Sequence, residues 1–372
     1  MGVDRGRGIC DNSIMRKEIK NTHMDHFEDR LVLAKSNPLS WIDDILNDKV
    51  SVSRKWDGAP SIFVGRDQHG TYVAKKGIFN KNPKLYHTSE EIEADLSGDL
   101  ASKFIEVLDT MQDCKLKVGD LIQGDLLFTR GDIQFQNDTY TFQANTIVYS
   151  SDEDLTKYWV GIVWHTKYVD GEALYGHDIV QMVGDVWGLW QFNATDEIDP
   201  IDKNARALLE YMKNDYNSKK KSFTLSPLTI DLFVCYINHT IKKGKFNHES
   251  NVNGFADFVV GHLQRKVDQV KREETKQKRI DEYAPVFSDL PKIKIVGELH
   301  GLLYKMKMVI LESLNRSSSI DTFLRTSTGL IPTGHEGYVV INKHGKDAVK
   351  IVDREEFSRA NFSDDILKGW DK

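Results

Sequence analysis

Hydrophobic and polar positions follow two different rhythms along the chain, which divides it into strand-rich and helix-rich parts. Between Val50 and about Thr166, short runs of β-branched and aromatic residues are separated by turn-forming residues, a pattern typical of strands, with one helix predicted over 90–111. Strands resume at Gly337. Apolar residues recur at helical spacing in the part between, and helices are predicted over 204–212, 227–243, 254–282, 295–314 and from residue 321 onward.

The amino-terminal part is predicted to contain a tail and two short helices. Residues 1–20 are polar and basic without apolar periodicity, which indicates a flexible tail. From Asp25 to Leu46 apolar residues recur near helical spacing, and the pattern is broken at Asn37-Pro38. Two short helices are therefore expected before the first strand.

The order of strands, helices and strands predicts an α+β fold. A mixed, largely antiparallel domain made of residues 21–170 and 331–372 would carry a helical insertion over 171–330, which we expect to form a separate lobe. Two segments within the strand-rich parts, 65–70 and 344–345, have the glycines of hairpin turns.

Composition excludes several classes of protein. With 372 residues, 40% hydrophobic and 28% charged content, the chain has the profile of an ordinary globular protein. Its three cysteines lack C-x-x-C spacing, which argues against a disulfide framework or a zinc site. The sequence contains neither a run of eighteen apolar residues nor the apolar core of a signal peptide, so we expect a cytoplasmic protein without a membrane role.

The formal net charge of −6 bears on nucleic-acid binding, because phosphate backbones are bound by Lys and Arg side chains. Any nucleic-acid-binding surface must therefore be confined to a part of the chain where Lys and Arg gather. The best candidate is the segment 264–279, which holds seven basic and three acidic residues. The alternative is a solvated helix face whose charges pair at i, i+4 spacing.

Polar residues interrupt several of the apolar runs in a fixed order along the chain. Asp125, Trp164 and Lys350 lie within such runs, and Glu336 stands directly before one. A carboxylate or ammonium in a buried strand must be paired, bound to a metal or directed at a ligand, and for any single residue a satisfied core ion pair is the competing interpretation. Together with Lys55 in the segment Lys-Trp-Asp-Gly, the series indicates one functional site.

This series resembles the covalent nucleotidyltransferase superfamily, which comprises ATP-dependent DNA ligases, RNA ligases and mRNA-capping enzymes. Its motifs run from a nucleophilic lysine in K-x-D-G, through a strand-borne acid, an aromatic residue and a Glu-Gly strand, to a final lysine strand, and the likeness covers 51–166 and 334–353. Lys-Trp-Asp-Gly-Ala-Pro followed by residues 77–81 is similar to an uncharacterised ligase-like family of tailed bacteriophages, and this narrower likeness adds residues 22–29. The resemblance implies an ATP-grasp-like ligase adenylation fold. Only 22 residues follow Lys350, too few for a carboxy-terminal OB-fold.

The resemblance also implies a role for each matching residue. Lys55 would attack the α-phosphate of ATP and form a lysyl-AMP intermediate, and Arg54 would help to lower its pKa. Asp57 and Gly58 would shape the turn beside the nucleotide. The remaining contacts would come from Lys75 or Lys76 in place of a ligase arginine, from Trp164 stacked on the adenine, from Asp125 and Glu336 at the ribose or at Mg²⁺ or Mn²⁺, and from Lys350 at the α-phosphate.

The activity so implied is that of an ATP-dependent polynucleotide ligase, acting as a monomer on a nucleic acid with 5′-phosphate and 3′-hydroxyl ends. RNA is favoured over DNA because no OB-fold follows, and a phage-encoded protein would work in the host-cell cytoplasm. The alternative is a nucleotide- or nucleic-acid-binding protein that keeps the fold without turnover. Three departures from the ligase pattern support it: Ala59 near an expected arginine, Asp125 for Glu, and Val352 for a second lysine.

Two further groups receive no catalytic role. His23 and His26 are three residues apart in a segment that we expect to be exposed, so a surface role is favoured over a metal pair. Glu298 follows a glycine, as the acid of a ligase motif does, but its surroundings are helical.

Overall fold

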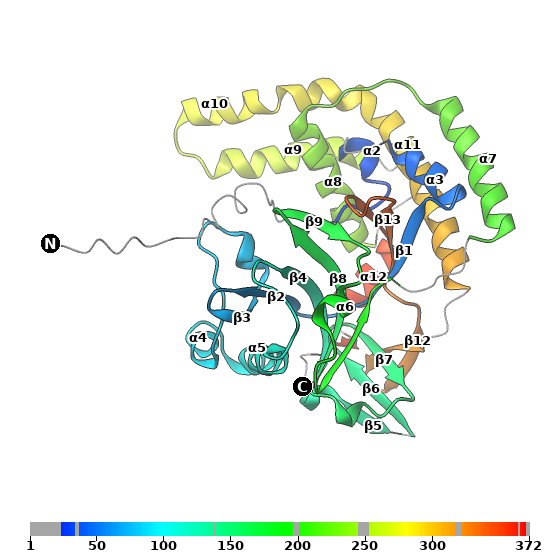
Figure 1. Cartoon of the computed structure of the whole chain (residues 1–372). Coiled ribbons are helices and arrows are strands. Elements are labelled where there is room, and N and C mark those ends of the chain that lie inside the picture. Colours follow the sequence, from blue (N-terminus) through cyan, green and yellow to red (C-terminus); the bar gives the residue numbers. More distant parts are fainter. Residues whose placement is uncertain are drawn as a thin grey trace.

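The computed structural model describes residues 24–33, 37–136, 138–195, 201–244, 253–316, 321–363 and 365–369. The tail predicted over 1–20, and His23, lie outside the described residues. In the described part, three largely antiparallel sheets meet a layer of helices, as Figure 1 shows. The predicted class, α+β with largely antiparallel sheets, is confirmed.

Sheet A joins strands from opposite ends of the chain. Its order is β1–β13–β14, and its strands are β1 (Val50–Lys55), β13 (Gly337–Asn342) and β14 (Ala348–Ile351). The strands pair antiparallel, with Lys55 opposite Gly337. At the outer edge of β14, the Lys350 NH donates to the Asp25 carbonyl at 2.9 Å and the Phe27 NH donates to the Lys350 carbonyl at 3.2 Å. Residues 25–27 therefore extend this sheet.

Sheet B is a second sheet with six strands. Its order is β10–β8–β4–β2–β3, with β9 also paired to β8, and β10 runs parallel to β8 while the other pairs are antiparallel. The strands are β2 (Ser61–Asp67), β3 (Gly70–Ala74), β4 (Leu121–Thr129), β8 (Val160–Val169), β9 (Glu172–Tyr175) and β10 (Leu189–Asn193).

Helices cover one face of sheet B and leave the other for sheet A. The covering helices are α4 (Ser89–Glu93), α5 (Gly98–Met111) and α6 (Ile179–Val183). Ile162 and Trp164 of β8 are buried in the same core as Phe104 of α5. Because strand side chains alternate between faces, Val163 and His165 point the other way.

Sheet C packs against the end of sheet B through aromatic side chains. Its order is β12–β11–β7–β6–β5, with β15 paired to β11. The strands are β5 (Gln134–Gln136), β6 (Thr139–Gln143), β7 (Ile147–Ser151), β11 (Thr322–Thr326), β12 (Gly329–Thr333) and β15 (Ile366–Leu367). Trp56, which follows β1, joins this aromatic core, with its ring centroid 4.8 Å from that of Tyr149.

The long helices cover the face of sheet A that points away from sheet B. Leu209 of α7 (Lys203–Lys219) and Leu303 of α11 (Ala284–Asn315) share a core with Tyr338 and Val349 of sheet A, and α3 (Pro38–Leu46) completes it. The expected separate lobe is therefore wrong, because the apolar face of sheet A needs these helices as its cover. The other described helices are α2 (Arg30–Leu33), α8 (Pro227–Lys242), α9 (Asn253–Asp268), α10 (Glu273–Glu282) and α12 (Arg354–Phe362).

Several predicted boundaries differ from the structure. The range 171–330 is not wholly helical, since β9 and β10 belong to sheet B and β11 and β12 to sheet C. The helix expected from 321 is strand β11, whose Thr-Phe-Leu-Arg-Thr sequence favours a strand. The helix expected over 254–282 is two helices, α9 and α10. Both predicted hairpin turns are present, between β2 and β3 and between β13 and β14.

Short helical turns complete the framework around the sheets. They are η1 (Lys76–Phe79), η2 (Arg130–Asp132) and η3 (Leu155–Lys157). Across the described ranges, no helix combines the length and the apolar character needed to cross a membrane.

Candidate active site

A pocket opens between sheets A and B, on the face of sheet B that the helices leave uncovered. Including its open mouth, it encloses about 560 Å³. The pocket is lined by Met24, Ser53, Arg54, Lys55, Trp56, Asp125, Val163, His165, Tyr175, Ala194, Val339, Ile341 and Lys350.

The sheet registers explain why distant segments meet in this pocket. Lys55 is the last residue of β1 and lies opposite Gly337, so Glu336, directly before β13, stands beside it. Lys350 on β14 is paired with Val339 of β13, and both side chains reach the pocket. Asp125 comes from β4 across the pocket. The predicted residues Arg54, Lys55, Asp125, Glu336 and Lys350 are thus brought together.

Lys55 forms an ion pair with Glu336, whose side chain is only 7% exposed. Burial by itself would lower the pKa of Lys55, but the carboxylates of Glu336, Asp125 and Asp57 together outweigh burial and raise that pKa above its ordinary value. Burial also raises the pKa of Glu336 to about 7, against the pull of Lys55. The expected lowering of the Lys55 pKa is therefore wrong for the protein without ligand, and Arg54 does not bring it about.

The pocket carries more positive than negative groups. Arg54, Lys55 and Lys350 line it together with the carboxylate of Asp125, and Glu336 pairs with Lys55 at its edge. Burial, and next the charge of Lys55, lower the pKa of Lys350 to about 8. A lysine whose charge is disfavoured in this way is stabilised by any anion that enters, so the pocket is suited to an anionic ligand.

Asp57 and Gly58 shape the loop that follows β1. The Asp57 carboxylate accepts hydrogen bonds from the Asn145 side chain at 2.6 Å and from the backbone NH groups of Thr146 at 2.7 Å and Ile147 at 2.9 Å. Asp57 therefore holds the loop to sheet C and does not line the pocket. A Cβ on Gly58 would stand 2.6 Å from the Cβ of Asp125, so glycine allows this loop to approach β4.

Trp164 cannot stack on a nucleotide in this fold. Its side chain is fully buried against α5 and α6, and its Nε1 donates to Gln191 at 2.9 Å. The prediction was wrong because Trp164 points to the helix-covered face of sheet B. The rings that line the pocket are Trp56, His165 and Tyr175, for which no role was predicted from the sequence. Strand alternation around Trp164 was the signal that could have found His165.

Lys75 and Lys76 do not line the pocket either. Lys75 follows β3, which is an edge strand of sheet B, and its Nζ lies 3.2 Å from Asp95. Asp95 also binds Lys84 and accepts a hydrogen bond from Tyr86 at 2.5 Å. The expected replacement for the ligase arginine is therefore not supplied by these two lysines.

The two predicted metal ligands differ in their readiness to bind a cation. Asp125 lies at the pocket with a quarter of its side chain exposed, and its carboxylate lies 3.7 Å from His165 Nε2. Such a carboxylate fits a metal ligand. Glu336, in contrast, is already engaged by Lys55.

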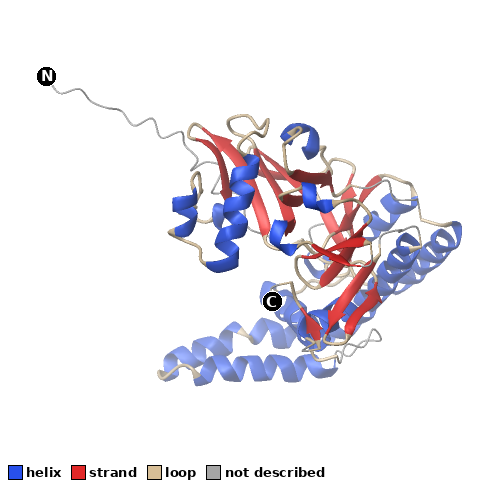
Figure 2. Ribbon diagram, turned by 90° about the horizontal axis from the view of Figure 1, so that it is seen from below, coloured by secondary structure: helices blue, strands red, loops and turns tan. Residues whose placement is uncertain are grey.

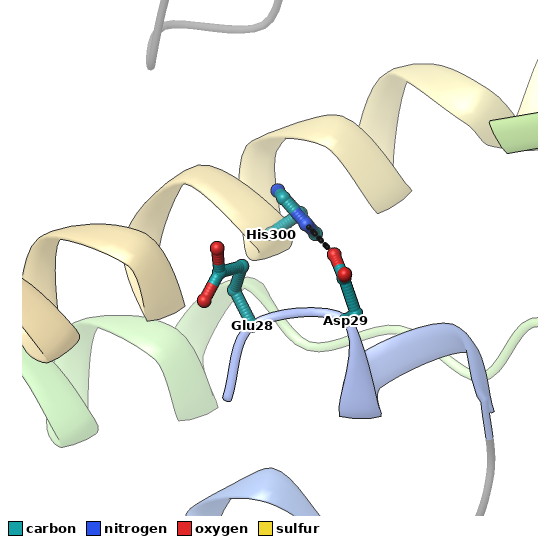
Figure 3. Close-up of side chains that lie close together, drawn as sticks. All are labelled: Glu28, Asp29 and His300. Atoms are coloured by element: carbon teal, nitrogen blue, oxygen red, sulfur yellow. Dashed lines mark hydrogen bonds and ion pairs between the residues drawn. The ribbon is translucent and has the colours of Figure 1, made fainter. Parts of the chain in front are cut away.

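A second group of possible metal ligands consists of Glu28, Asp29 and His300 (Figure 3). One nitrogen or oxygen atom of each side chain lies within 4.8 Å of those of the other two. Two cations occupy it, since Lys307 lies 2.8 Å from Glu28 and Arg354 bonds both carboxylates at 3.0 and 3.1 Å. These cations already neutralise the carboxylates, so a metal ion does not fit. The segment around His26, expected to be exposed, is instead largely buried.

Comparison with known families assigns this chain to a family. Residues 21–365 match a family of unknown function (DUF6267), and the protein belongs to that family. No curated protein matches the chain. No solved structure matches it either.

Proposed function

We propose that this protein is an ATP-dependent nucleotidyltransferase of the polynucleotide-ligase type, with Lys55 as its nucleophile. The observation that carries the proposal is the pocket between sheets A and B. It joins Lys55, Asp125, Glu336 and Lys350, the residues that the sequence resemblance relates to catalysis, and its excess of positive groups suits the phosphates of a nucleotide.

The proposed chemistry has three steps. The Lys55 Nζ, after losing a proton, attacks the α-phosphorus of ATP, so an N–P bond forms and the P–O bond to pyrophosphate breaks. A nucleic-acid 5′-phosphate oxygen then attacks the same phosphorus, and the N–P bond breaks to release Lys55. Finally a 3′-hydroxyl attacks the activated 5′-phosphate, and AMP leaves with the bonding electrons as the strand is sealed. RNA is the favoured substrate.

The pocket residues have distinct tasks in this scheme. Lys350 and Arg54 would neutralise phosphate charge, and Trp56 or Tyr175 would contact the base, since these rings line the pocket. Mg²⁺ or Mn²⁺, held by Asp125 with phosphate oxygens and water, would neutralise charge at the transferred group. Glu336, which holds Lys55 in the free protein, can accept the proton that Lys55 must lose, because its pKa is near 7.

The test is covalent labelling. Purified protein is incubated with α-labelled ATP and Mg²⁺ or Mn²⁺ and then denatured, and label on the chain is measured. Label should appear on the wild type, disappear on adding pyrophosphate, and fall at least about a thousandfold in Lys55→Ala. Lys346→Ala is the matched control, because this exposed lysine lies in the turn between β13 and β14 and not at the pocket, and it should label normally.

One observation favours a second function, nucleotide binding without turnover. Glu336 holds Lys55 in an ion pair in the free protein, and this pairing favours the protonated, unreactive ammonium. Under this alternative, folded protein freed of bound AMP would bind ATP but carry no label with ATP, GTP or NAD. That result would overturn the enzymatic proposal.

A further inference from the structure

Helices α9 and α10 form an arm that projects from the body of the molecule. In Figures 1 and 2 the arm extends to the same side as the β3 and α4 end of sheet B. Its base is anchored by the buried side chains of Phe255, Val259 and Tyr283, and His262 is hydrogen-bonded to the Tyr283 hydroxyl at 2.6 Å. In contrast, α10 contributes no buried residue at all.

The outer part of the arm is strongly basic. Residues 264–279 hold seven basic and three acidic residues, a formal charge of +4, whereas the whole chain carries −6 and the remainder therefore −10. Such a separation of charge concentrates the positive potential on one projecting element.

Most of these cations are not used within the protein. Lys276 pairs with Glu273 and Arg279 with Glu282. The other five side chains are exposed and form no ion pair with any residue that the structure describes: Arg265, Lys266, Lys271, Arg272 and Lys278. Most of the basic residues are therefore exposed, as the alternative of a solvated helix face expects, but they lack its i, i+4 ion pairs with other described residues.

The chemistry of the outer arm favours a polyanion over a protein surface. Protein interfaces are anchored by buried aromatic or apolar side chains. No large hydrophobic side chain of residues 264–279, all of which the structure describes, is among the exposed ones. A group of exposed Lys and Arg side chains without such anchors suits the phosphates of a nucleic-acid backbone.

We infer that the outer part of the α9–α10 arm, residues 264–279, binds the phosphate backbone of the nucleic-acid substrate. The identity of this partner rests on the proposed function. The arm would hold the strand through sequence-independent charge contacts while the end of the strand reaches the pocket. These contacts raise affinity for any sequence and weaken steeply as salt increases.

The experiment compares two charge-matched triple variants. The arm variant carries Lys271→Gln, Arg272→Gln and Lys278→Gln, all at exposed positions. The control carries Lys219→Gln, Lys220→Gln and Lys221→Gln at the end of α7, which lies on the opposite side of the molecule (Figure 1). Binding of a fluorescent single-stranded RNA and of a nicked duplex is measured without ATP across a range of salt concentrations. Lys55 labelling by ATP is measured separately.

The arm variant should bind at least about tenfold more weakly at low salt, and the slope of log affinity against log salt should fall by about 2, near 0.7 for each lost phosphate contact. The control should change affinity less than about twofold, and both variants should label Lys55 as the wild type does. Equal binding by the two variants would overturn the inference, as would binding to anionic vesicles with no binding to nucleic acid. Arm-dependent nucleic-acid binding without Lys55 labelling would instead defeat only the enzymatic proposal.

Discussion

Two clusters of buried carboxylates and cations lie near β14, and they differ in how completely their charges are matched. One is the pocket pair Lys55–Glu336 with Lys350 beside it. The other, here called the charge network, consists of Glu28, Asp29, His300, Lys307 and Arg354, and it ties residues 28–29 to α11 and α12. The first cluster faces a pocket, and the second faces only protein.

In the charge network the carboxylates are held ionised. Burial would raise the pKa of Glu28, but Lys307 and then Arg354 outweigh it and hold that pKa well below its ordinary value. The pKa of Asp29 is lowered likewise, burial being outweighed chiefly by Arg354 and by the hydrogen bond from His300. Arg354 also donates to Asn238 of α8 at 2.6 Å. Two carboxylates thus face two cations within the network, although burial lowers the pKa of Lys307.

In the pocket the balance is different. Burial raises the pKa of Glu336 and lowers that of Lys350, so neither charge is fully compensated by its neighbours. Buried ion pairs are costly unless well matched. The comparison teaches that burial and charge alone do not mark a functional site in this protein. A functional site is instead marked by buried charges that their neighbours do not fully compensate and that face a pocket.

The largest expected effect comes from removing one lysine from each cluster. Lys307→Met should lower the free energy of unfolding by about 3–5 kcal/mol, because it leaves the fully buried Glu28 with a single cation. Lys55→Met should lower it by less than about 1 kcal/mol, since a quarter of the Lys55 side chain is exposed and Glu336 can take up a proton. Urea unfolding at pH 7 measures both. Equal losses would remove the distinction between the clusters.

A smaller effect concerns pH. Burial raises the pKa of Glu336 from its ordinary 4.5 to about 7, so the folded protein binds this proton more tightly than the unfolded chain does. The contribution of Glu336 to stability is therefore full below about pH 4.5 and is lost as pH rises through about 7. Over that window the wild type should lose about 2–3 kcal/mol more unfolding free energy than Glu336→Gln does.

The control for this pH experiment is Glu172→Gln, an exposed carboxylate that pairs with Lys346. It should follow the wild-type pH curve. A Glu336→Gln curve that runs parallel to the wild type from pH 4.5 to 8 would show that Glu336 is ionised throughout, as the carboxylates of the charge network are.

The sequence could predict the pocket better than the charge network, for a physical reason. Asp125, Glu336 and Lys350 each interrupt or open an apolar run, so their place on strands has a local signal. Glu28 and Lys307 are 279 positions apart, and nothing local to either residue reports their contact. Trp164 was placed on the right strand but the wrong face, because the period of a strand does not say which face meets helices.

The smallest expected effect separates two histidine–aspartate pairs. His300 Nε2 lies 3.0 Å from Asp29 in the charge network, and both side chains are buried. His165 Nε2 lies 3.7 Å from Asp125 at the pocket, with 28% and 25% of the side chains exposed. Because an exposed pair contributes little, His165→Ala should change the free energy of unfolding by less than about 0.5 kcal/mol. His300→Ala should lower it by about 1–3 kcal/mol, since Asp29 loses a buried hydrogen bond.

The same two variants should reverse their order when nucleotide binding is measured. His165→Ala removes a ring that lines the pocket and should weaken ATP affinity about tenfold, or about 1.4 kcal/mol. His300→Ala should leave ATP affinity within about twofold while the protein is folded, because His300 does not line the pocket. Unchanged ATP affinity in His165→Ala would place the nucleotide away from β8. A loss in His300→Ala would instead mean that the charge network serves the pocket, through the contact of residues 25–27 with Lys350.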